Sequence, residues 1–150
     1  MTIEEAKNKA EDFAKSFGEI FPGIYYSIRN PQEYIDCFYF DFIFVDHKNQ
    51  PPEEDIFAGG AYGVAVNKLT GICSTISSGA YSLLTSKTEE VYSVIAFIRE
   101  AKGATKLLAS VKVKYHFNSA ELLELNQLVM NLDITPENIL TIYNLVTRKE

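Results

Sequence analysis

Four phenylalanines spaced at every second position constrain the fold of this chain more than any other feature. They are Phe38, Phe40, Phe42 and Phe44, within the segment YIDCFYFDFIFVD. The side chains between and beside them are Cys37, Tyr39, Asp41, Ile43 and Val45. Successive side chains of a β-strand point to opposite faces, so a strand over this segment places all four rings on one face. Because burying each ring contributes roughly 1.5–3 kcal/mol, we expect this face to define the core.

An amphipathic helix over residues 2–17 is the element that we expect to cover this face. Thr2 and Glu5 have the spacing of a capping box, in which each side chain accepts a hydrogen bond from a backbone N–H group at the start of the helix. Apolar side chains at steps of three or four residues form one stripe: Ile3, Ala6, Ala10, Phe13 and Phe17. Gly18 is well placed to end the helix.

Turn-forming residues separate further strands from this one. Residues 24–29 contain aromatic and β-branched side chains between Pro22-Gly23 and Asn30-Pro31, which predicts a short strand. Residues 46–56 are polar and contain Pro51-Pro52, which predicts an exposed loop.

The glycine-rich segment over residues 57–68 is predicted to form the next strand. Tyr62 is expected to share one face with the valines two and four positions later, while the small residues between them suit the close approach of another element. Residues 67–71, with the sequence NKLTG, predict a hairpin turn in which Gly71 supplies a positive φ. A last strand follows this turn.

Residues 81–150 are predicted to be mainly helical. Ser86 and Glu89 have the spacing of a second capping box, and an apolar stripe follows them. A further helix is expected after Ser119, and Thr135-Pro136 has the pattern of a helix start, with proline at the first helical position.

The segment over residues 106–117 fits two patterns. Leu107, Leu108, Val111 and Tyr115 fit a helix, whereas Val111, Val113, Tyr115 and Phe117 fit a strand. We interpret it as a strand by a narrow margin.

These elements together predict an α+β fold. It consists of an N-terminal helix packed on an antiparallel sheet of about four strands, followed by a mainly helical C-terminal part. Residues 1–80 form one predicted domain. Residues 81–150 form a second region, and whether it packs with the first as one domain stays open.

The charge of the chain limits its partners. It carries 20 acidic and 14 basic residues, for a net charge of −6, and the basic residues are scattered. Binding to nucleic acid or to an anionic membrane surface depends on gathered Lys and Arg, so we expect neither partner. An acidic protein meets a basic partner more readily. The chain shows no signal-peptide pattern and no apolar run of about 18 residues, which predicts a cytoplasmic protein.

No residue pattern in the chain predicts catalysis. His47 and His116 lack metal-ligand spacing to a Cys or to each other. Cys37 and Cys73 lie in strand-like segments, where thiols are inert, so we expect two free thiols in the core. The glycine-rich segment lacks the Lys and Ser/Thr of a phosphate loop. We therefore expect a protein that is not an enzyme and binds no cofactor or metal.

Two kinds of candidate site remain. Tyrosine is enriched at protein interfaces, and acidic side chains attract a basic partner, so we assign partner binding to Glu53, Glu54, Asp55 and Tyr62. Asp41 lies inside an apolar strand, where a carboxylate is costly unless it is paired or lies at a wet edge. It either bonds to a neighbouring strand or is the polar group of a pocket.

Residues 46–77 combine the polar Pro-rich loop, the run AGGAYG and the hairpin VAVNKLTG. With the N-terminal helix, these features resemble the YrhB-like immunity proteins of bacterial polymorphic-toxin systems (immunity family thirty-five), over residues 1 to about 80. The resemblance implies a helix-plus-sheet domain that neutralises a toxin by binding it. The hairpin pattern V-x-V-N-x-x-T-G is also similar to PepSY and cystatin-like modules, which bind or inhibit peptidases and so also imply binding.

Three hypotheses for the function follow. The first is an immunity-type protein that covers a basic toxin domain with acidic and tyrosine-bearing loops. The second is a small-molecule-binding protein or enzyme, with a pocket between the phenylalanine face and the helix and with Asp41 as its polar group. The third is an oligomeric scaffold domain.

Overall fold

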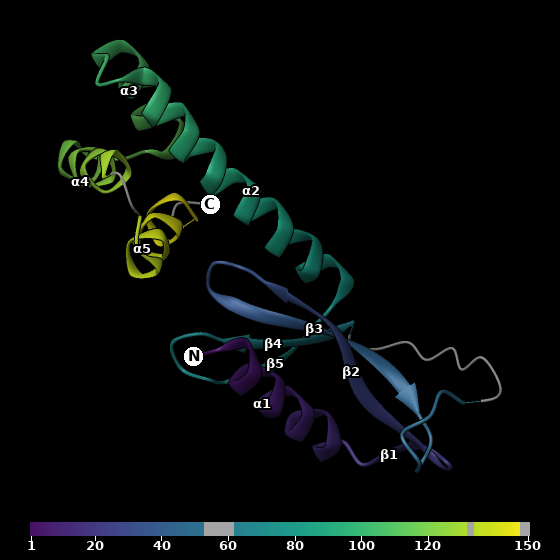
Figure 1. Cartoon of the computed structure of the whole chain (residues 1–150). Coiled ribbons are helices and arrows are strands. Elements are labelled where there is room, and N and C mark those ends of the chain that lie inside the picture. Colours follow the sequence, from purple (N-terminus) through teal and green to yellow (C-terminus); the bar gives the residue numbers. More distant parts are fainter. Residues whose placement is uncertain (53–61, 132–133, 148–150) are drawn as a thin grey trace. The chain divides into compact units, whose positions relative to one another are not determined.

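The computed structural model describes residues 1–52, 62–131 and 134–147 of the chain. The chain divides into two compact units, Met1–Leu83 and Leu84–Glu150. The fold is α+β, as predicted, with an N-terminal helix packed on an antiparallel sheet and helices after the sheet (Figure 1).

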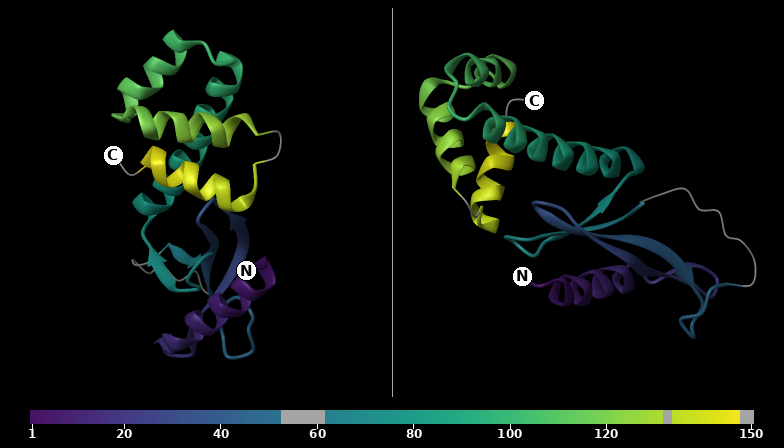
Figure 2. Two further views of the ribbon diagram at one scale, coloured as in Figure 1. Left: turned by 90° about the vertical axis from the view of Figure 1, so that its left-hand side faces the viewer. Right: turned by 45° about the horizontal axis from the view of Figure 1, so that its top comes forward.

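The first unit is built from one helix and a sheet. Its elements among the described residues are α1 (Ile3–Ser16), β1 (Glu19–Phe21), β2 (Ile24–Glu33), β3 (Cys37–Val45), β4 (Gly63–Asn67) and β5 (Cys73–Ile76). The strands pair antiparallel in sequence order, so each strand lies beside its neighbours in the chain. α1 lies along one face of this sheet (Figures 1 and 2).

The predicted capping box begins α1. The Thr2 side chain accepts a hydrogen bond from the Glu5 backbone N–H, and the Glu5 side chain accepts one from the Thr2 backbone N–H at 2.7 Å. Phe17 caps the other end, and Gly18 follows with a φ of +66°, the conformation that glycine adopts without steric cost. Both predicted ends of this helix are confirmed within one residue.

The phenylalanine face of β3 defines the core of this unit, as predicted. Its buried cluster consists of Ala6, Ala10, Phe38, Phe40, Val64 and Val66, with Phe13, Ile28, Phe42 and Cys73 packed against it. Phe38 and Phe40 are 4% and 1% exposed, and the two alanines of α1 are fully buried. Alanine has the smallest apolar side chain, so the helix axis approaches the phenylalanine face closely.

The prediction for the strand over residues 24–29 is wrong at its end. β2 continues through Asn30-Pro31 to Glu33, because the ladder accommodates one extra residue there. Arg29 pairs with Asp41, but Gln32 pairs with Tyr39, and Asn30 adopts a φ of +53° within the bulge. The strand β1, which the sequence pattern did not predict, brings the described sheet to five strands rather than about four.

The β4–β5 hairpin forms at the predicted turn. The Asn67 side-chain oxygen accepts hydrogen bonds from the backbone N–H groups of Leu69 and Thr70, and Gly71 has a φ of +70°. Of the predicted strand over residues 57–68, β4 accounts for Gly63–Asn67, while residues 57–61 lie outside the described part of the chain.

The second unit is built from helices, the first of which begins in the first unit. Its helices are α2 (Ser78–Ala101), α3 (Thr105–Tyr115), α4 (Ser119–Met130) and α5 (Pro136–Thr147), with the first residues of α2 belonging to the first unit. The predicted helix start at Ser86 and Glu89 is wrong, because both residues lie inside the continuous helix α2. The predicted apolar stripe is buried and comprises Val91, Val94, Ile95 and Ile98.

The interpretation of residues 106–117 as a strand is also wrong, because α3 occupies Thr105–Tyr115. Val111 and Tyr115, four residues apart, are 6% exposed each, whereas Val113 between them is 74% exposed. The burial therefore follows the helical period and not the strand period. His116 ends α3 in the left-handed conformation, with a φ of +56°.

The last two helices form as predicted, except that α4 begins at Ser119 itself and not after it, because Asn118 is the residue that caps it. α4 has Asn118 as its N-cap, with Glu121 completing a capping box, and α5 has Thr135 in the same role, accepting from the Asn138 backbone N–H at 3.1 Å. α4 packs against both α3 and α5. No helix within the described residues is both long enough and apolar enough to cross a membrane.

Candidate functional site

Three tyrosine rings pack together on the face of the sheet that points away from α1. Tyr39 comes from β3, Tyr62 immediately precedes β4, and Tyr81 lies in the first turns of α2. The ring centroids of Tyr39 and Tyr81 lie 4.7 Å apart, those of Tyr62 and Tyr81 5.0 Å, and those of Tyr39 and Tyr62 6.3 Å. Tyr39 is fully buried, while Tyr62 is 46% exposed. We call these three residues the tyrosine cluster.

A glutamine on β2 fixes one side of the tyrosine cluster. The Gln32 side-chain oxygen accepts hydrogen bonds from the hydroxyl of Tyr81 at 2.9 Å and from the hydroxyl of Tyr34 at 2.7 Å. The bulge in β2 makes this possible, because it places Gln32 opposite Tyr39 in the ladder. The first turn of α2 is thereby tied to the sheet within the first unit.

The Tyr39 hydroxyl is the least satisfied group in the cluster. It is buried, and among the described residues no acceptor meets it in full hydrogen-bond geometry. Burial raises the pKa of Tyr39 well above its usual range, and the Asp41 carboxylate raises it further, by weak hydrogen bonding with the hydroxyl and by its negative charge. The phenol is therefore held neutral and does not act as a base.

Asp41 lies on the same strand as Tyr39, two residues along, and is half-buried. Its carboxylate accepts a hydrogen bond from the Asn30 side-chain amide at 3.1 Å. Arg29 is its cross-strand neighbour, yet within the described part of the chain no cationic side chain forms an ion pair with Asp41. The carboxylate is thus bonded to a neighbouring strand, as one of the two sequence-based interpretations expected, but its charge has no counter-ion.

The structure brings two of the predicted site residues onto one surface. Asp41 pairs with Gly63 in the ladder, and Gly63 directly follows Tyr62. The Tyr62 carbonyl also accepts from the Phe42 backbone N–H at 3.2 Å. Glu53, Glu54 and Asp55, also assigned to partner binding, lie outside the described residues.

The predicted orientation of Tyr62 is wrong. Val64 and Val66 point into the core beneath α1, but the Tyr62 ring packs on Tyr39, on the opposite face. The reason is that β4 begins at Gly63, so Tyr62 precedes the strand and does not follow its alternation. Tyr81 was missed because it lies in a helix far along the sequence, and no local spacing connects it with the sheet.

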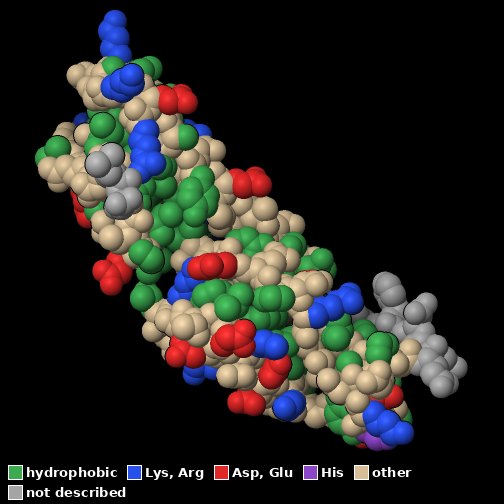
Figure 3. All heavy atoms as spheres, viewed as in Figure 1, with side chains coloured by type: hydrophobic (Ala, Val, Ile, Leu, Met, Phe, Trp, Pro, Cys, Tyr) green, Lys and Arg blue, Asp and Glu red, His purple; other side chains and the backbone are tan. Residues whose placement is uncertain are grey.

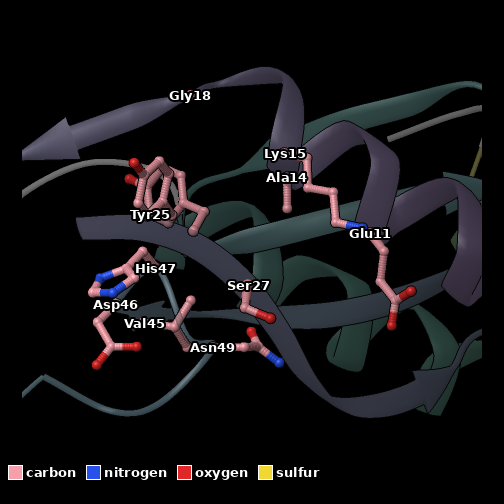
Figure 4. Close-up of a pocket in the computed structure, with 11 residues that line it drawn as sticks. Glu11, Ala14, Lys15, Gly18, Tyr25, Ser27, Val45, Asp46, His47 and Asn49 are labelled. Atoms are coloured by element: carbon pink, nitrogen blue, oxygen red, sulfur yellow. The ribbon is translucent and has the colours of Figure 1, made fainter. Parts of the chain in front are cut away.

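A second feature of this unit is an open groove of about 700 Å³ beside the end of α1 (Figure 4). Its lining residues are Glu11, Ala14, Lys15, Gly18, Tyr25, Tyr26, Ser27, Val45, Asp46, His47 and Asn49. Glu11 and Lys15 extend from α1, whereas Asp46, His47 and Asn49 belong to the turn after β3. Asp41 does not line this groove.

The turn after β3 is held by the Asp46 side chain. Its carboxylate accepts from the backbone N–H groups of Lys48 at 2.8 Å and Gln50 at 3.0 Å. The pKa of Asp46 is lowered chiefly by the bond from Gln50, which together with the bond from Lys48 and the charges of His47 and Lys48 outweighs the opposing effect of desolvation. The wall of the groove that carries His47 and Asn49 is therefore a defined turn with an ionised carboxylate at its base.

The thiols are poorly suited to chemistry. Both cysteines are free, Cys37 buried and Cys73 half-buried. Burial, with the adjacent Asp36 carboxylate, raises the pKa of Cys37 to about 12, and burial also raises the pKa of Cys73. A thiol in this state is a weak nucleophile because the thiolate is the reactive form. Over the described ranges, no three His, Cys, Asp or Glu side chains are gathered as metal ligands.

Charged side chains of both signs are interspersed over α1 on the face of the molecule drawn in Figure 3, and neither sign forms a continuous patch there.

Comparisons of the chain with protein-family models, with curated proteins and with solved structures each found no match.

Proposed function

We propose that the Met1–Leu83 unit is a non-catalytic protein-binding module whose contact surface is centred on Tyr62. The observation that carries the proposal is the position of this ring. Residue Tyr62 is 46% exposed, yet its ring packs against two other tyrosine rings, at centroid distances of 5.0 and 6.3 Å.

A ring held in this way is well prepared for an interface. Tyrosine supplies a large contact area together with a polar hydroxyl, and it is enriched among the residues that dominate binding energy. Immobilising a free side chain at an interface costs about 0.5–1.5 kcal/mol, and a ring already packed on its neighbours avoids much of this cost. Tyr39 and Tyr81 thus support Tyr62 without themselves needing to touch the partner.

The proposed partner is a basic protein. Glu53, Glu54 and Asp55 precede Tyr62 by only a few positions in the sequence, and the whole chain has a net charge of −6. Complementary charge accelerates encounter and excludes acidic competitors. A basic toxin domain, as the resemblance to bacterial immunity proteins implies, has this chemistry, and the chain would then neutralise the toxin by covering it.

The test is capture of a partner by the full chain from an extract of the organism that encodes it, followed by mass spectrometry. We expect one basic protein to be retained in stoichiometric amount by the wild-type chain and lost with Tyr62→Ala. Leu69→Ala is the matched control, because Leu69 is 76% exposed on the same unit but lies in the hairpin turn. Equal retention by Tyr62→Ala and the wild type would refute the proposal.

Charge reversal at Glu53, Glu54 and Asp55 tests the acidic part of the surface separately. We expect the charge-reversed variant to retain less of the same basic protein than the wild type does. This difference should be smaller at high salt, because exposed charges are screened by salt. Retention that is unchanged at low salt would remove these three residues from the proposed surface.

A second candidate function, small-molecule binding, is favoured by the groove beside α1. Its volume of about 700 Å³ is within the usual range for ligand sites, about 300–1,000 Å³. Native mass spectrometry of the purified chain tests this candidate. A bound compound that is lost in Glu11→Gln and Lys15→Gln would support it, whereas a mass equal to that of the chain alone after gentle purification would count against it.

A further inference from the structure

We infer that Asp41 and Tyr62 together bind the guanidinium group of an arginine side chain on the protein partner. This inference rests on the proposed function, because it requires a partner that reaches the tyrosine cluster. It adds the chemical group that the partner inserts and the residue that supplies the opposite charge.

The first step is the unneutralised charge of Asp41. The carboxylate is half-buried in the middle of a strand, and the groups beside it, the Asn30 amide and the Tyr39 hydroxyl, are both neutral. No ion pair to it occurs within the described ranges. A carboxylate removed from water without a counter-ion is unfavourable. A cation supplied by a partner relieves this cost, so the site favours a positively charged ligand group.

The second step is the hydroxyl beside this carboxylate. The Asp41 side chain is the acceptor that acts on the Tyr39 hydroxyl, but a neutral hydroxyl does not balance the charge of a carboxylate. Because Tyr39 is fully buried, a partner would reach Asp41 and the exposed Tyr62 and not the Tyr39 oxygen.

The third step distinguishes arginine from other cations. The rings of the tyrosine cluster lie in direct contact, with centroids 4.7–6.3 Å apart, so no cation of either kind fits between them. A cation must instead lie on the exposed side of Tyr62. A guanidinium group is planar, stacks on an aromatic ring and donates paired hydrogen bonds to a carboxylate, whereas an ammonium group does neither as well.

The chain itself does not fill this role with Arg29. That residue is the cross-strand neighbour of Asp41, but it is exposed and forms no ion pair with it among the described residues. The Asp41 carboxylate remains open to an external cation.

Three short peptides of one length test the inference by nuclear magnetic resonance with the full-length chain. They are acetyl-Gly-Arg-Gly-amide, its lysine counterpart and its citrulline counterpart, which keeps the shape of arginine without the charge. We expect the arginine peptide, at about millimolar concentration, to shift the backbone amide signals of Asp41, Tyr62 and Gly63. The lysine peptide should bind more weakly, and the citrulline peptide should leave these signals unchanged.

Two variants identify the carboxylate. Asp41→Asn keeps an oxygen that can accept from Asn30 but removes the charge, and we expect it to weaken binding of the arginine peptide about tenfold. Asp12→Asn makes the same change at an exposed position of α1 and should leave the affinity unaltered. Equal shifts with the arginine and citrulline peptides, or equal affinity for the wild type and Asp41→Asn, would overturn the inference.

The two proposals fail in different ways. If Tyr62→Ala loses the partner but the arginine peptide shifts none of these signals, the arginine assignment is wrong and the binding surface stands. If the peptide binds through Asp41 but Tyr62→Ala retains the partner as well as the wild type does, the protein-binding proposal is wrong. The assignment of the guanidinium group to a partner is then wrong as well.

Discussion

The Tyr39 hydroxyl lies directly over the backbone of Gly63 on the neighbouring strand. A Cβ atom added at Gly63 would overlap both this hydroxyl and the carbonyl oxygen of Phe40. The absence of a side chain at Gly63 is therefore what allows Tyr39 to pack flat against β4. The expectation that small residues in this strand serve a close approach is met at this position.

Gly63→Ala should destabilise the first unit for this reason. The added methyl group displaces Tyr39 or the β3 backbone, and overpacking of this kind costs about 1–3 kcal/mol. Gly79→Ala is the control, because a Cβ there would make only an ordinary contact with Ser77 and alanine favours the helix. Urea denaturation of both variants measures the difference. A Gly63→Ala chain as stable as the wild type would show that Tyr39 is not packed as described.

Cys37 should make the chain less stable as the pH rises above 9. Burial raises its pKa from 9.0 in the unfolded chain to about 12 in the folded one. Between these values the unfolded state has lost a proton that the folded state retains, so the free energy of unfolding falls with rising pH, by up to about 1.4 kcal/mol per pH unit.

The comparison of the wild type with Cys37→Ala isolates this effect from other groups that titrate in the same range. Urea denaturation at about pH 8 and about pH 10 should show a larger loss of stability for the wild type. Identical losses in the two chains would mean that the thiol ionises as readily in the folded state as in the unfolded one.

Asn118→Ala should destabilise the second unit by about 1 kcal/mol, because it removes the N-cap of α4. The Asn118 side chain accepts from the Glu121 backbone N–H at 2.8 Å, and the Glu121 side chain accepts from the Asn118 backbone N–H at 3.0 Å. Ser119→Ala, one position on, removes only an exposed bond with Lys112 and should cost a few tenths of a kcal/mol. The opposite ranking of these variants in thermal denaturation would reassign the N-cap to Ser119.

Arg99→Ala should loosen the end of α4. The Arg99 guanidinium donates to the carbonyl oxygens of Val129 at 3.2 Å and Asn131 at 3.3 Å, where the helix leaves carbonyl groups unpaired. We expect a loss of about 1–2 kcal/mol and faster hydrogen exchange in the last turn of α4. Lys106→Ala removes an exposed cation from the same unit and serves as the control. Unchanged exchange in Arg99→Ala would show that these bonds do not hold the helix end.

The elements predicted correctly are those whose signals are local in sequence. The capping box of Thr2 and Glu5 and the alternation from Phe38 to Phe44 each lie within a few residues, and each element forms where the pattern indicated. The hairpin turn ending at Gly71 is of the same kind. Local hydrogen bonds and one apolar face are sufficient to determine these structures.

The failed predictions involve competition between local patterns and packing. In α3, Val113 fits the alternation of a strand, but packing buries only Val111 and Tyr115, and the helix prevails. In the candidate site, Tyr62 was found from its residue type, but its partner Tyr81 comes from another element. Contacts between distant segments carry no signal in a single sequence.

The bulge in β2 decides which side chain supports the tyrosine cluster. If this sequence formed a regular ladder, the pairing of Arg29 with Asp41 would place Pro31, not Gln32, opposite Tyr39. Proline has no side-chain oxygen to accept from the hydroxyls of Tyr34 and Tyr81. A local irregularity of the backbone thus selects the glutamine that anchors the cluster, a role that no inventory of surface residues would reveal.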